Sequence, residues 1–340
     1  MEMKKKCYDY LWLLKNANQA ISQFVPKISL RNRLHLFLEV QDAYLKNGYD
    51  PKDFFLFDYH SLTAEERLSY ICKREHYRMV YFFNSKSEIE FLQDKWKTYQ
   101  RYFDFFNRKV FNVTWDSKTE WRESLSSFEK LIIKPIDGTF GNGVRIMGQQ
   151  DFFNISALKK LYPKGFVAEE IIEQDDEMSA LHPESVNTIR IYTICYGMKV
   201  VAFHPWLRIG RGSSIIDNAS AGGIGAACDF RTGKITRAGD KLGHVFEVHP
   251  DNGKKLIGFK IPQWEDAIDL AKRLALVNPQ LHYAGWDLAL SKNGWVLVEG
   301  NPRAQMGFQI FENKGFRPDL DSILKDFNLF DDYYSVVFDY

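Results

Sequence analysis

Asp287, Glu299 and Asn301 are the residues of this sequence best suited to hold a divalent cation. Mg²⁺ prefers oxygen ligands, takes one or two carboxylates from a protein, and leaves its other positions to water and substrate phosphates. Solvated charges at an exposed hairpin tip are the alternative. Glu299 and Asn301, however, follow an apolar run in which burial is expected, and a buried charge requires a partner. The three side chains therefore predict a metal-nucleotide site rather than a closed metal cage.

A β-hairpin would bring these three side chains together. Two apolar segments rich in strand-forming residues flank the sequence SKNG at 291–294, which is typical of a turn. With Leu290 opposite Trp295, a single bulged residue places Asp287 opposite Glu299. The two polar residues of the second strand lie two positions apart and therefore point to the same face.

The glycine-rich sequence DGTFGNG at 137–143 is a candidate phosphate-binding loop. It follows the apolar segment Phe128–Pro135 and precedes VRIM, so it predicts a loop between two paired strands. Glycines let backbone amides approach an anion closely, and Lys134 adds a cation where phosphate charge would lie. An ordinary hairpin turn is the alternative. The sequence lacks a GxxxxGK[ST] loop and the acidic residue of a dinucleotide-binding βαβ unit, which excludes those two motifs.

Charged residues also lie within other apolar segments. Phe166–Ile172, FVAEEII, carries Glu169 and Glu170, and this combination suits an adenine slot in which backbone groups read the ring edge. The acidic run EQDDE that follows is either an exposed loop or part of the site. Arg190 and Arg208 lie inside two later apolar strands, where an arginine requires an anionic partner.

Composition limits the class of protein. The 340 residues include 45 Lys and Arg against 44 Asp and Glu, so the net charge of +1 gives no global attraction to nucleic acid or to a membrane. Four scattered cysteines without a CxxC pair argue against zinc ligation and a disulfide framework, and they fit a reducing compartment. No uncharged stretch approaches the roughly 20 residues of a membrane helix. We therefore expect a cytoplasmic protein. Its basic N-terminal sequence, MEMKKK, is expected to begin an amphipathic helix, and its lysines leave peripheral contact with a membrane open.

Hydrophobic periodicity divides the chain into two regions. Residues 1–93 alternate helical patterns with short breaks and contain a capping box at Thr63 and Glu66, so we expect a mostly helical N-terminal lobe. Residues 94–340 mix strands and helices. They include a loop-rich stretch at 210–234 whose length is typical of a functional element or of disorder, and the apolar content of its IGAACDF segment favours order. Within this region, about 128–172 contains the glycine-rich loop and the adenine slot, and about 173–320 contains the arginines and the metal residues.

The order of these segments resembles the ATP-grasp superfamily. The matching pieces are Asp94-Lys95, Lys134 with DGTFGNG, FVAEEII, the GWD of 285–287 and the EGNP of 299–302. SVNTIRIYT, DNASAGGIGAACDFRTGK and NGYDPKDFFLFDY with the following TAEER are similar to the sugar-transfer-associated ATP-grasp family, whose members are associated with polysaccharide biosynthesis. The resemblance implies an α+β protein with the ATP-grasp fold, in which two α+β lobes sandwich the nucleotide, here preceded by the helical lobe.

The resemblance also implies roles for individual residues, with ATP and Mg²⁺ as cofactors. Lys95 and Lys134 would contact the phosphates, and Arg303 would face a carboxylate substrate. The loop closing over the phosphates would comprise Gly138, Thr139, Phe140, Gly141, Asn142 and Gly143. The adenine hinge would comprise Glu169, Glu170, Ile171 and Ile172, with Glu173 or Glu177 at the ribose. Mg²⁺ would be held by Asp287, Glu299 and Asn301.

The chain departs from its relatives at two places. The D-alanine ligases carry an arginine two positions before the metal aspartate, where this chain has Gly285, so Arg190, Arg208 or Arg303 must supply that charge. Relatives usually begin with a Rossmann-like lobe, whereas residues 1–93 are expected to be helical here.

The implied activity is that of an ATP-dependent carboxylate-amine ligase. A carboxylate attacks the γ-phosphate of ATP while lysines and Mg²⁺ neutralise charge, and an amine then converts the acyl phosphate to an amide. The family context suggests a sugar acid or glycan precursor as the carboxylate and an amino acid or another amine as the acceptor. A kinase that phosphorylates a hydroxyl and a non-catalytic nucleotide-binding regulator of glycan assembly are the alternatives.

Overall fold

The computed structural model describes residues 2–115, 121–136, 138, 141–219, 222–306 and 308–338, except for the side chains of residues 2–10 and 122. The chain packs as two compact units. The first comprises Met1–Phe82 together with Gln305–Tyr340, and the second comprises Phe83–Ala304. Within the described ranges, no helix is long and apolar enough to cross a lipid bilayer.

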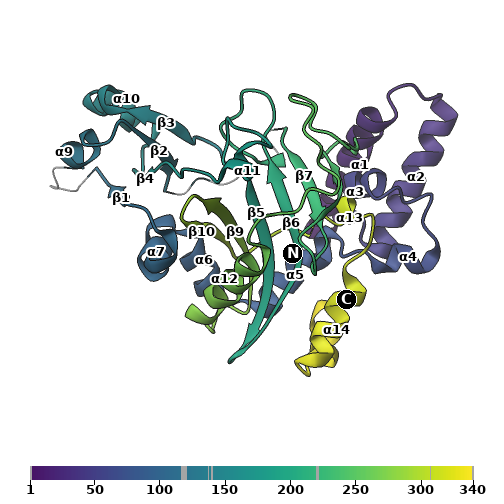
Figure 1. Ribbon diagram of the computed structural model, residues 1–340. Helices are drawn as coiled ribbons and strands as arrows, with labels where there is room; N and C mark the ends of the chain where they lie inside the picture. The colour runs from purple at the N-terminus through teal and green to yellow at the C-terminus, as the bar shows by residue number, and fades with distance from the viewer. Residues whose placement is uncertain are drawn as a thin grey trace. The chain divides into compact units, whose positions relative to one another are not determined.

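The first unit is built from helices, which the periodicity predicts for its N-terminal part. Glu66 N–H donates to Thr63 Oγ1 and Thr63 N–H donates to the Glu66 carboxylate, which confirms the predicted capping box. Buried Ile21, Val40 and Tyr49 belong to the hydrophobic core of this unit. Its helices, purple to blue and yellow in Figure 1, are α1 (Glu2–Phe24), α2 (Leu30–Asn47), α3 (Pro51–Leu56), α4 (Ala64–Ser69), α5 (Lys73–Phe83), α13 (Gln309–Glu312), α14 (Arg317–Asp326) and α15 (Phe330–Val337).

A buried ion pair joins the C-terminal segment of this unit to its N-terminal helices. Arg317 donates from Nη1 to Glu75 Oε1 at 2.6 Å, and Tyr333 Oη donates to the same oxygen at 3.1 Å. Burial raises the pKa of Glu75, and Arg317 opposes that rise. Gln309 adds a second connection, because its side-chain amide both donates to and accepts from the backbone of Ile71.

Replacing Arg317 by alanine is expected to lower the free energy of unfolding by about 2–3 kcal/mol, because Glu75 stays buried after losing its strongest donor. Urea unfolding measures this change. Lys314→Ala is the matched control, since the Lys314–Asp319 pair is exposed and its loss should cost at most about 1 kcal/mol. Equal effects of the two substitutions would contradict the role given to the buried pair.

The second unit contains two antiparallel sheets. The smaller sheet has the strand order β1-β4-β2-β3, and the larger has the order β10-β9-β5-β6-β7-β8. The strands are β1 (Val110–Val113), β2 (Lys130–Pro135), β3 (Arg145–Gly148), β4 (Phe166–Glu170), β5 (Thr188–Tyr196), β6 (Lys199–Ile209), β7 (Ile224–Cys228), β8 (Ile235–Gly239), β9 (Tyr283–Ser291) and β10 (Gly294–Asn301).

Helices pack on these sheets and complete the predicted α+β fold. Ala271 and Leu274 of α12 share a hydrophobic core with Ile189 of β5 and Trp286 of β9, so the apolar face of the helix covers the larger sheet. The helices of the unit are α6 (Lys86–Gln93), α7 (Lys95–Arg101), α8 (Phe103–Phe106), α9 (Trp121–Ser126), the 3₁₀ helix η1 (Gln149–Phe153), α10 (Ile155–Leu161), α11 (Asp176–Ser179) and α12 (Trp264–Val277).

The β9–β10 hairpin has the predicted register. Trp295 pairs with Leu290, and Glu299 pairs with Asp287 because Val298 is an extra residue in β10. Adjacent side chains of a regular strand point to opposite faces, whereas this bulge lets both Val298 and Glu299 line one cavity. A single irregular residue thus places an apolar side chain beside a carboxylate.

Candidate nucleotide site

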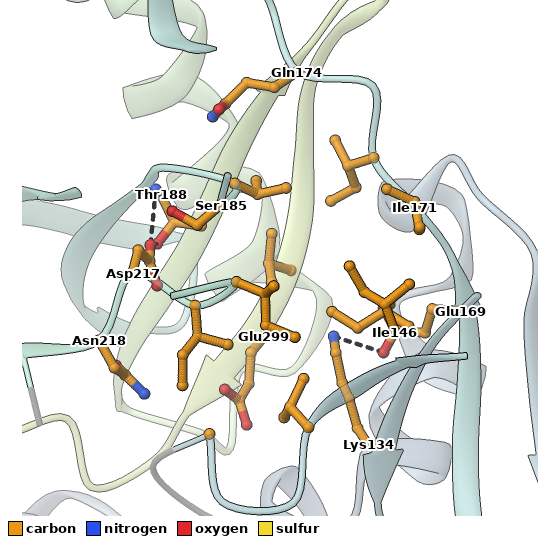
Figure 2. A pocket seen from close by; sticks show the side chains of 18 of the residues that line it. Lys134, Ile146, Glu169, Ile171, Gln174, Ser185, Thr188, Asp217, Asn218 and Glu299 are labelled. Carbon is orange, nitrogen blue, oxygen red and sulfur yellow. Dashed lines mark hydrogen bonds and ion pairs between the residues drawn. The ribbon is translucent and has the colours of Figure 1, made fainter. Parts of the chain in front are cut away.

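A cavity of about 380 Å³ lies within the second unit and is lined by residues of both sheets. Its lining combines charged and apolar side chains, several of which Figure 2 shows converging on one space. The charged residues include Lys95, Lys134 and Glu299, and the apolar residues include Ile132, Ile146, Ile171 and Val298. This size and mixed lining suit one ligand that has both an apolar ring and a charged tail.

Two lysines that are distant in the sequence reach this cavity. Lys95, at the start of α7, donates from Nζ to the carbonyl oxygen of Gly138 at 2.5 Å, and the same Nζ lies 3.9 Å from Glu299 Oε1. Lys134 of β2 lines the cavity as well. Both lysine side chains are largely shielded from solvent. Two cations at a partly enclosed cavity favour an anionic group such as a phosphate.

The carboxylate of Glu169 is held between two cations. Lys134 Nζ lies 2.8 Å from Oε1, and Arg108 donates from Nη2 to Oε2 at 2.6 Å. Arg108 also donates from Nη1 to the carbonyl oxygen of Leu297 at 2.7 Å, which links β4 to β10. Burial raises the pKa of Glu169, but Lys134 and Arg108 together lower it to about 2. Sequence reasoning missed Arg108, because nothing in its local pattern separates it from a surface arginine.

This cluster predicts a pH dependence of stability. The pKa of Glu169 falls from its ordinary 4.5 to about 2 on folding, so its stabilisation is complete above about pH 4.5 and is lost as pH falls toward 2. We expect Glu169→Gln to lower the free energy of unfolding by about 3 kcal/mol at neutral pH and progressively less in acid. Urea unfolding of both proteins across this range measures the difference. A difference that does not shrink in acid would contradict the assignment.

The glycine-rich loop connects β2 to β3, as the sequence predicts. Gly141 and Gly143 have φ angles of +75° and +76°, a backbone conformation that favours glycine. Thr139 and Phe140 lie outside the described residues. The described loop residues that line the cavity are Gly138, Gly141 and Asn142.

The end of β4 and the segment that follows it form one wall of the cavity. Its predicted hinge residues, Glu169 to Ile172, all line the cavity. Glu173 and Glu177 are not among the described residues that line it, whereas Gln174 is. Gln174 donates from Nε2 to the carbonyl oxygen of Asn187 at 2.8 Å. The ribose role of Glu173 or Glu177 stays a prediction, and Gln174 is a polar side chain of the wall that sequence reasoning missed.

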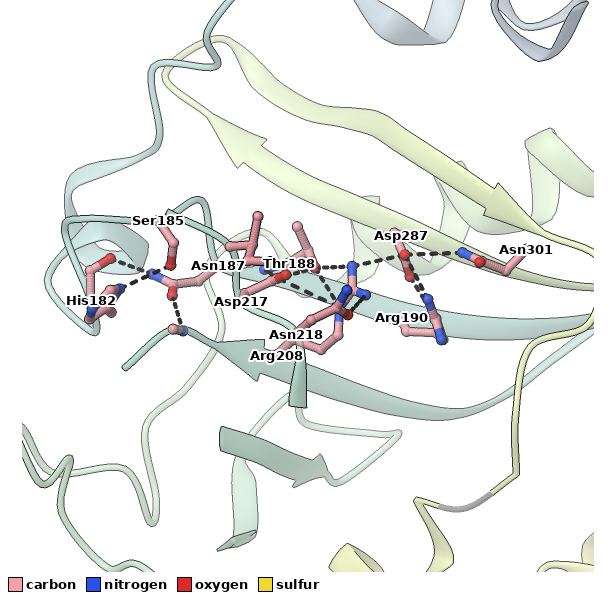
Figure 3. Close-up of polar contacts among 12 residues, drawn as sticks. His182, Ser185, Asn187, Thr188, Arg190, Arg208, Asp217, Asn218, Asp287 and Asn301 are labelled. Atoms are coloured by element: carbon pink, nitrogen blue, oxygen red, sulfur yellow. Dashed lines mark hydrogen bonds and ion pairs between the residues drawn. The ribbon is translucent and has the colours of Figure 1, made fainter. Parts of the chain in front are cut away.

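Asp287 is fully buried at the centre of a polar network (Figure 3). Arg190, its partner across β5 and β9, donates from Nε and Nη2 to the two carboxylate oxygens at 2.6 and 2.7 Å. Arg208 Nη2 lies 2.8 Å from Oδ2, and Asn301 donates from Nδ2 to the same oxygen at 3.0 Å. Burial raises the pKa of Asp287, but the two guanidinium groups outweigh burial and lower it. Both arginines therefore have the anionic partner that their apolar strands require.

Arg190 reaches Asp287 by passing Gly285. A Cβ atom built on Gly285 would lie 3.3 Å from Arg190 Cδ and 2.4 Å from the Cβ atom of Ala304. Glycine at this position therefore leaves the volume that the arginine side chain occupies. Of the three arginines that the sequence leaves open for this charge, Arg190 and Arg208 lie at Asp287, whereas Arg303 is exposed and is not among the described cavity residues.

The long loop after β6 contributes a second buried carboxylate, Asp217. Its Oδ2 accepts hydrogen bonds from the N–H and Oγ1 of Thr188 at 2.9 and 2.5 Å, and it lies 3.6 Å from Arg208 Nε. Burial raises the pKa of Asp217, partly offset by Arg208. Arg208 also donates from Nη1 to Asn218 Oδ1 at 3.0 Å. These four residues line the cavity, and the polar pair DN within a loop of small residues is the signal that could have identified two of them.

The oxygen donors expected to hold Mg²⁺ lie next to one another but differ in access. Glu299 lines the cavity with a side chain that is 45% exposed, whereas the oxygens of Asp287 are engaged by Arg190, Arg208 and Asn301. Among the described residues, no group of three or more His, Cys, Asp or Glu side chains is arranged to hold a metal ion. Two carboxylates and an amide are nevertheless the donor type that Mg²⁺ prefers, so the set fits this ion in its chemistry. The metal assignment stays a prediction.

Comparison with known proteins gives one family and several similar structures. The model of the sugar-transfer-associated ATP-grasp family matches residues 74–325. The ATP-grasp ligase PsnB complexed with a minimal precursor has 16% identity and a TM-score of 0.43, covering 72% of this chain and 63% of that one. The D-alanine–D-alanine ligase from Bacillus anthracis has 15% identity and a TM-score of 0.40, covering 73% and 68%.

A third similar structure is an N5-carboxyaminoimidazole synthase from Aspergillus clavatus in complex with ADP and a ribonucleotide. It has 12% identity and a TM-score of 0.44, and the match covers 75% of this chain and 58% of that one. The chain spans less than two thirds of the length of PsnB. A search of curated proteins finds no significant match.

The family match extends over well over half of the chain and includes each segment that forms the cavity: the β2–β3 loop, the end of β4, the loop after β6 and the β9–β10 hairpin. The resemblance drawn from the sequence is thereby confirmed, and the chain belongs to the sugar-transfer-associated ATP-grasp family.

Proposed function

We propose that the protein binds Mg²⁺-ATP and joins a carboxylate to an amine through an acyl phosphate. The observation that carries this proposal is the convergence of Lys95, Lys134 and Glu299 on one cavity inside the second unit. Two cations and a carboxylate brought together from distant parts of the sequence match the needs of a metal-bound triphosphate.

The cavity offers complementary surfaces to the two ends of ATP. Ile132 and Ile146 of the smaller sheet and Val298 of the larger sheet line it with apolar groups, which would sandwich the adenine ring. The backbone that follows Glu170 would read the ring edge. Lys134, held by Glu169, would contact the phosphates together with Lys95, and the glycine-rich loop would close over them.

The magnesium ion would be held by Glu299, with Asp287 and Asn301 as further oxygen donors, and when bound it would neutralise charge on the phosphate oxygens. Arg208 contacts both the Asp287 carboxylate and Asn218 at the cavity wall. Its guanidinium would therefore stabilise negative charge on the phosphoryl group during transfer.

The chemistry takes place in two steps. A carboxylate oxygen of the substrate forms a bond to the γ-phosphorus of ATP as the bond to the β,γ-bridging oxygen breaks, which gives an acyl phosphate and ADP. The amine nitrogen then bonds to the acyl carbon, phosphate leaves, and the amine proton passes to solvent. The chain needs no covalent nucleophile for either step, because positioning and charge stabilisation lower both barriers.

The family to which the chain belongs directs the proposal to sugar chemistry. We propose a sugar acid or another glycan precursor as the carboxylate and an amino acid or a related amine as the acceptor. An ADP-release screen of the purified full chain with Mg²⁺-ATP, crossing uronic acids and sugar-linked carboxylates with amines, tests this proposal.

ADP release that requires both an acid and an amine is the expected result, and Glu299→Gln should abolish it. A phosphorylated hydroxyl in the product mixture would instead identify a kinase. Tight ATP binding without turnover under every combination would identify a nucleotide-binding regulator.

A further inference from the structure

A stripe of exposed leucines runs along α2 in the first unit. Leu30, Leu34, Leu38 and Leu45 are 87%, 62%, 54% and 67% exposed. With 3.6 residues per turn, these four lie within about 80° of one another around the helix axis. Single exposed leucines are ordinary. Four aligned on one helix form a continuous apolar surface, which is typical of a site that contacts a membrane or another protein. We call these four residues the leucine stripe.

The stripe is additional to the face of α2 that packs in the core of its unit. Leu36, Val40 and Ala43 are buried against that core. The stripe also continues to α1 at its C-terminal end, where the ring of partly exposed Trp12 lies 6.0 Å from the ring of Tyr44. Tryptophan beside exposed leucine is typical of helices that lie in a membrane interface.

The charge of this helical hairpin favours an anionic partner. Residues 1–47 contain eight Lys and Arg against four Asp and Glu, an excess of four positive charges in a chain whose net charge is +1. Lys27 and Arg31, at the N-terminal end of the stripe, are exposed. Of the two acidic residues of α2, Asp42 lies 2.9 Å from Lys46, and Glu39 lies 3.5 Å from the ring nitrogen Nε2 of His35.

A second copy of this chain is a less suitable occupant. Parallel pairing of the stripe with itself would set Arg31 against Arg31, and antiparallel pairing would set Arg31 against Lys46, so both directions oppose like charges. Anionic headgroups neutralise these cations while the acyl region receives the leucines. We propose that α1 and α2 dock the protein on a membrane surface containing anionic phospholipid, with the leucine stripe inserted at the interface.

Co-sedimentation of the full chain with vesicles of phosphatidylcholine, with and without phosphatidylglycerol, tests this docking. We expect binding that requires phosphatidylglycerol and weakens with added salt. Leu34→Glu/Leu38→Glu should lower the partition coefficient at least about tenfold. Leu68→Glu/Leu161→Glu, at exposed leucines outside the stripe, is the matched control and should bind like wild type.

A second variant tests the same proposal without changing any apolar residue, so it is not expected to disturb folding. Lys27→Gln/Arg31→Gln changes exposed charges alone and should also weaken binding to the anionic vesicles, while ADP release in solution stays unchanged for both sets of variants. Equal binding to both vesicle types, or unchanged binding of the leucine variant, would overturn the proposal. So would a wild-type dimer that the leucine variant converts to a monomer, because the stripe would then be occupied by a second copy.

Discussion

A Lys134→Ala variant is expected to lose ATP-dependent ADP release by about 10²–10³-fold, the loss typical of removing one preorganised charge from a transition state. Lys134 lines the cavity with its Nζ held 2.8 Å from Glu169, so the cation is fixed before a phosphate arrives. Removing it should weaken charge stabilisation during phosphoryl transfer more than nucleotide binding. Initial rates with saturating ATP, compared with the ATP dissociation constant, separate the two effects.

The Lys134 variant should remain folded, because Glu169 keeps its 2.6 Å hydrogen bond from Arg108. Circular dichroism and the urea midpoint report this directly. Lys130→Ala is the matched control, since Lys130 begins the same strand but is exposed. A folded Lys134 variant with wild-type turnover would remove Lys134 from the proposed mechanism.

Asp287→Ala is expected to lower the free energy of unfolding by about 3–5 kcal/mol, the range found when a buried ion pair loses one partner. Asp287 is fully buried, and its carboxylate is the shared anion of Arg190 and Arg208. Both guanidinium groups would remain inside the sheet with their common counter-charge removed. The urea midpoint should fall while the denaturant slope stays the same, because the surface exposed on unfolding hardly changes.

Asp269→Ala provides the comparison for this measurement. Asp269 and Arg273 form an exposed pair 3.8 Å apart on α12, and its loss should cost at most about 1 kcal/mol. If Asp287→Ala were no more destabilising than Asp269→Ala, Asp287 would not be the counter-ion that stabilises buried Arg190 and Arg208, and the role given to it here would be wrong.

The local patterns of the sequence predicted the β9–β10 hairpin in detail. Turn composition and strand periodicity favoured a hairpin, and with Leu290 opposite Trp295 one bulged residue was needed to bring Asp287 opposite Glu299, as the structure has it. These properties depend on residues that are close in the chain, so they are encoded locally. The glycine-rich loop between paired strands was predictable for the same reason.

Contacts between distant segments could not be predicted in this way. Arg108 donates hydrogen bonds to Glu169 and to the backbone of Leu297, and Asp217 accepts one from Thr188. These residues are far apart in the sequence, and hydrophobic periodicity gives no information about contacts at such separations. The sequence predicted that Arg190 has an anionic partner. It did not predict that this partner is Asp287, because the contact depends on strands β5 and β9 being neighbours. Strand order is a property of the whole chain, and this sequence alone does not determine it.

The packing around Gly285 limits which side chains this position of β9 can accept. An arginine introduced at 285 would collide with Ala304, whose Cβ atom would lie 2.4 Å from the new Cβ, even after Arg190 had been truncated. A larger residue at 285 would therefore require a smaller residue at 304 as well, because truncating Arg190 alone leaves the contact with the Ala304 Cβ atom in place.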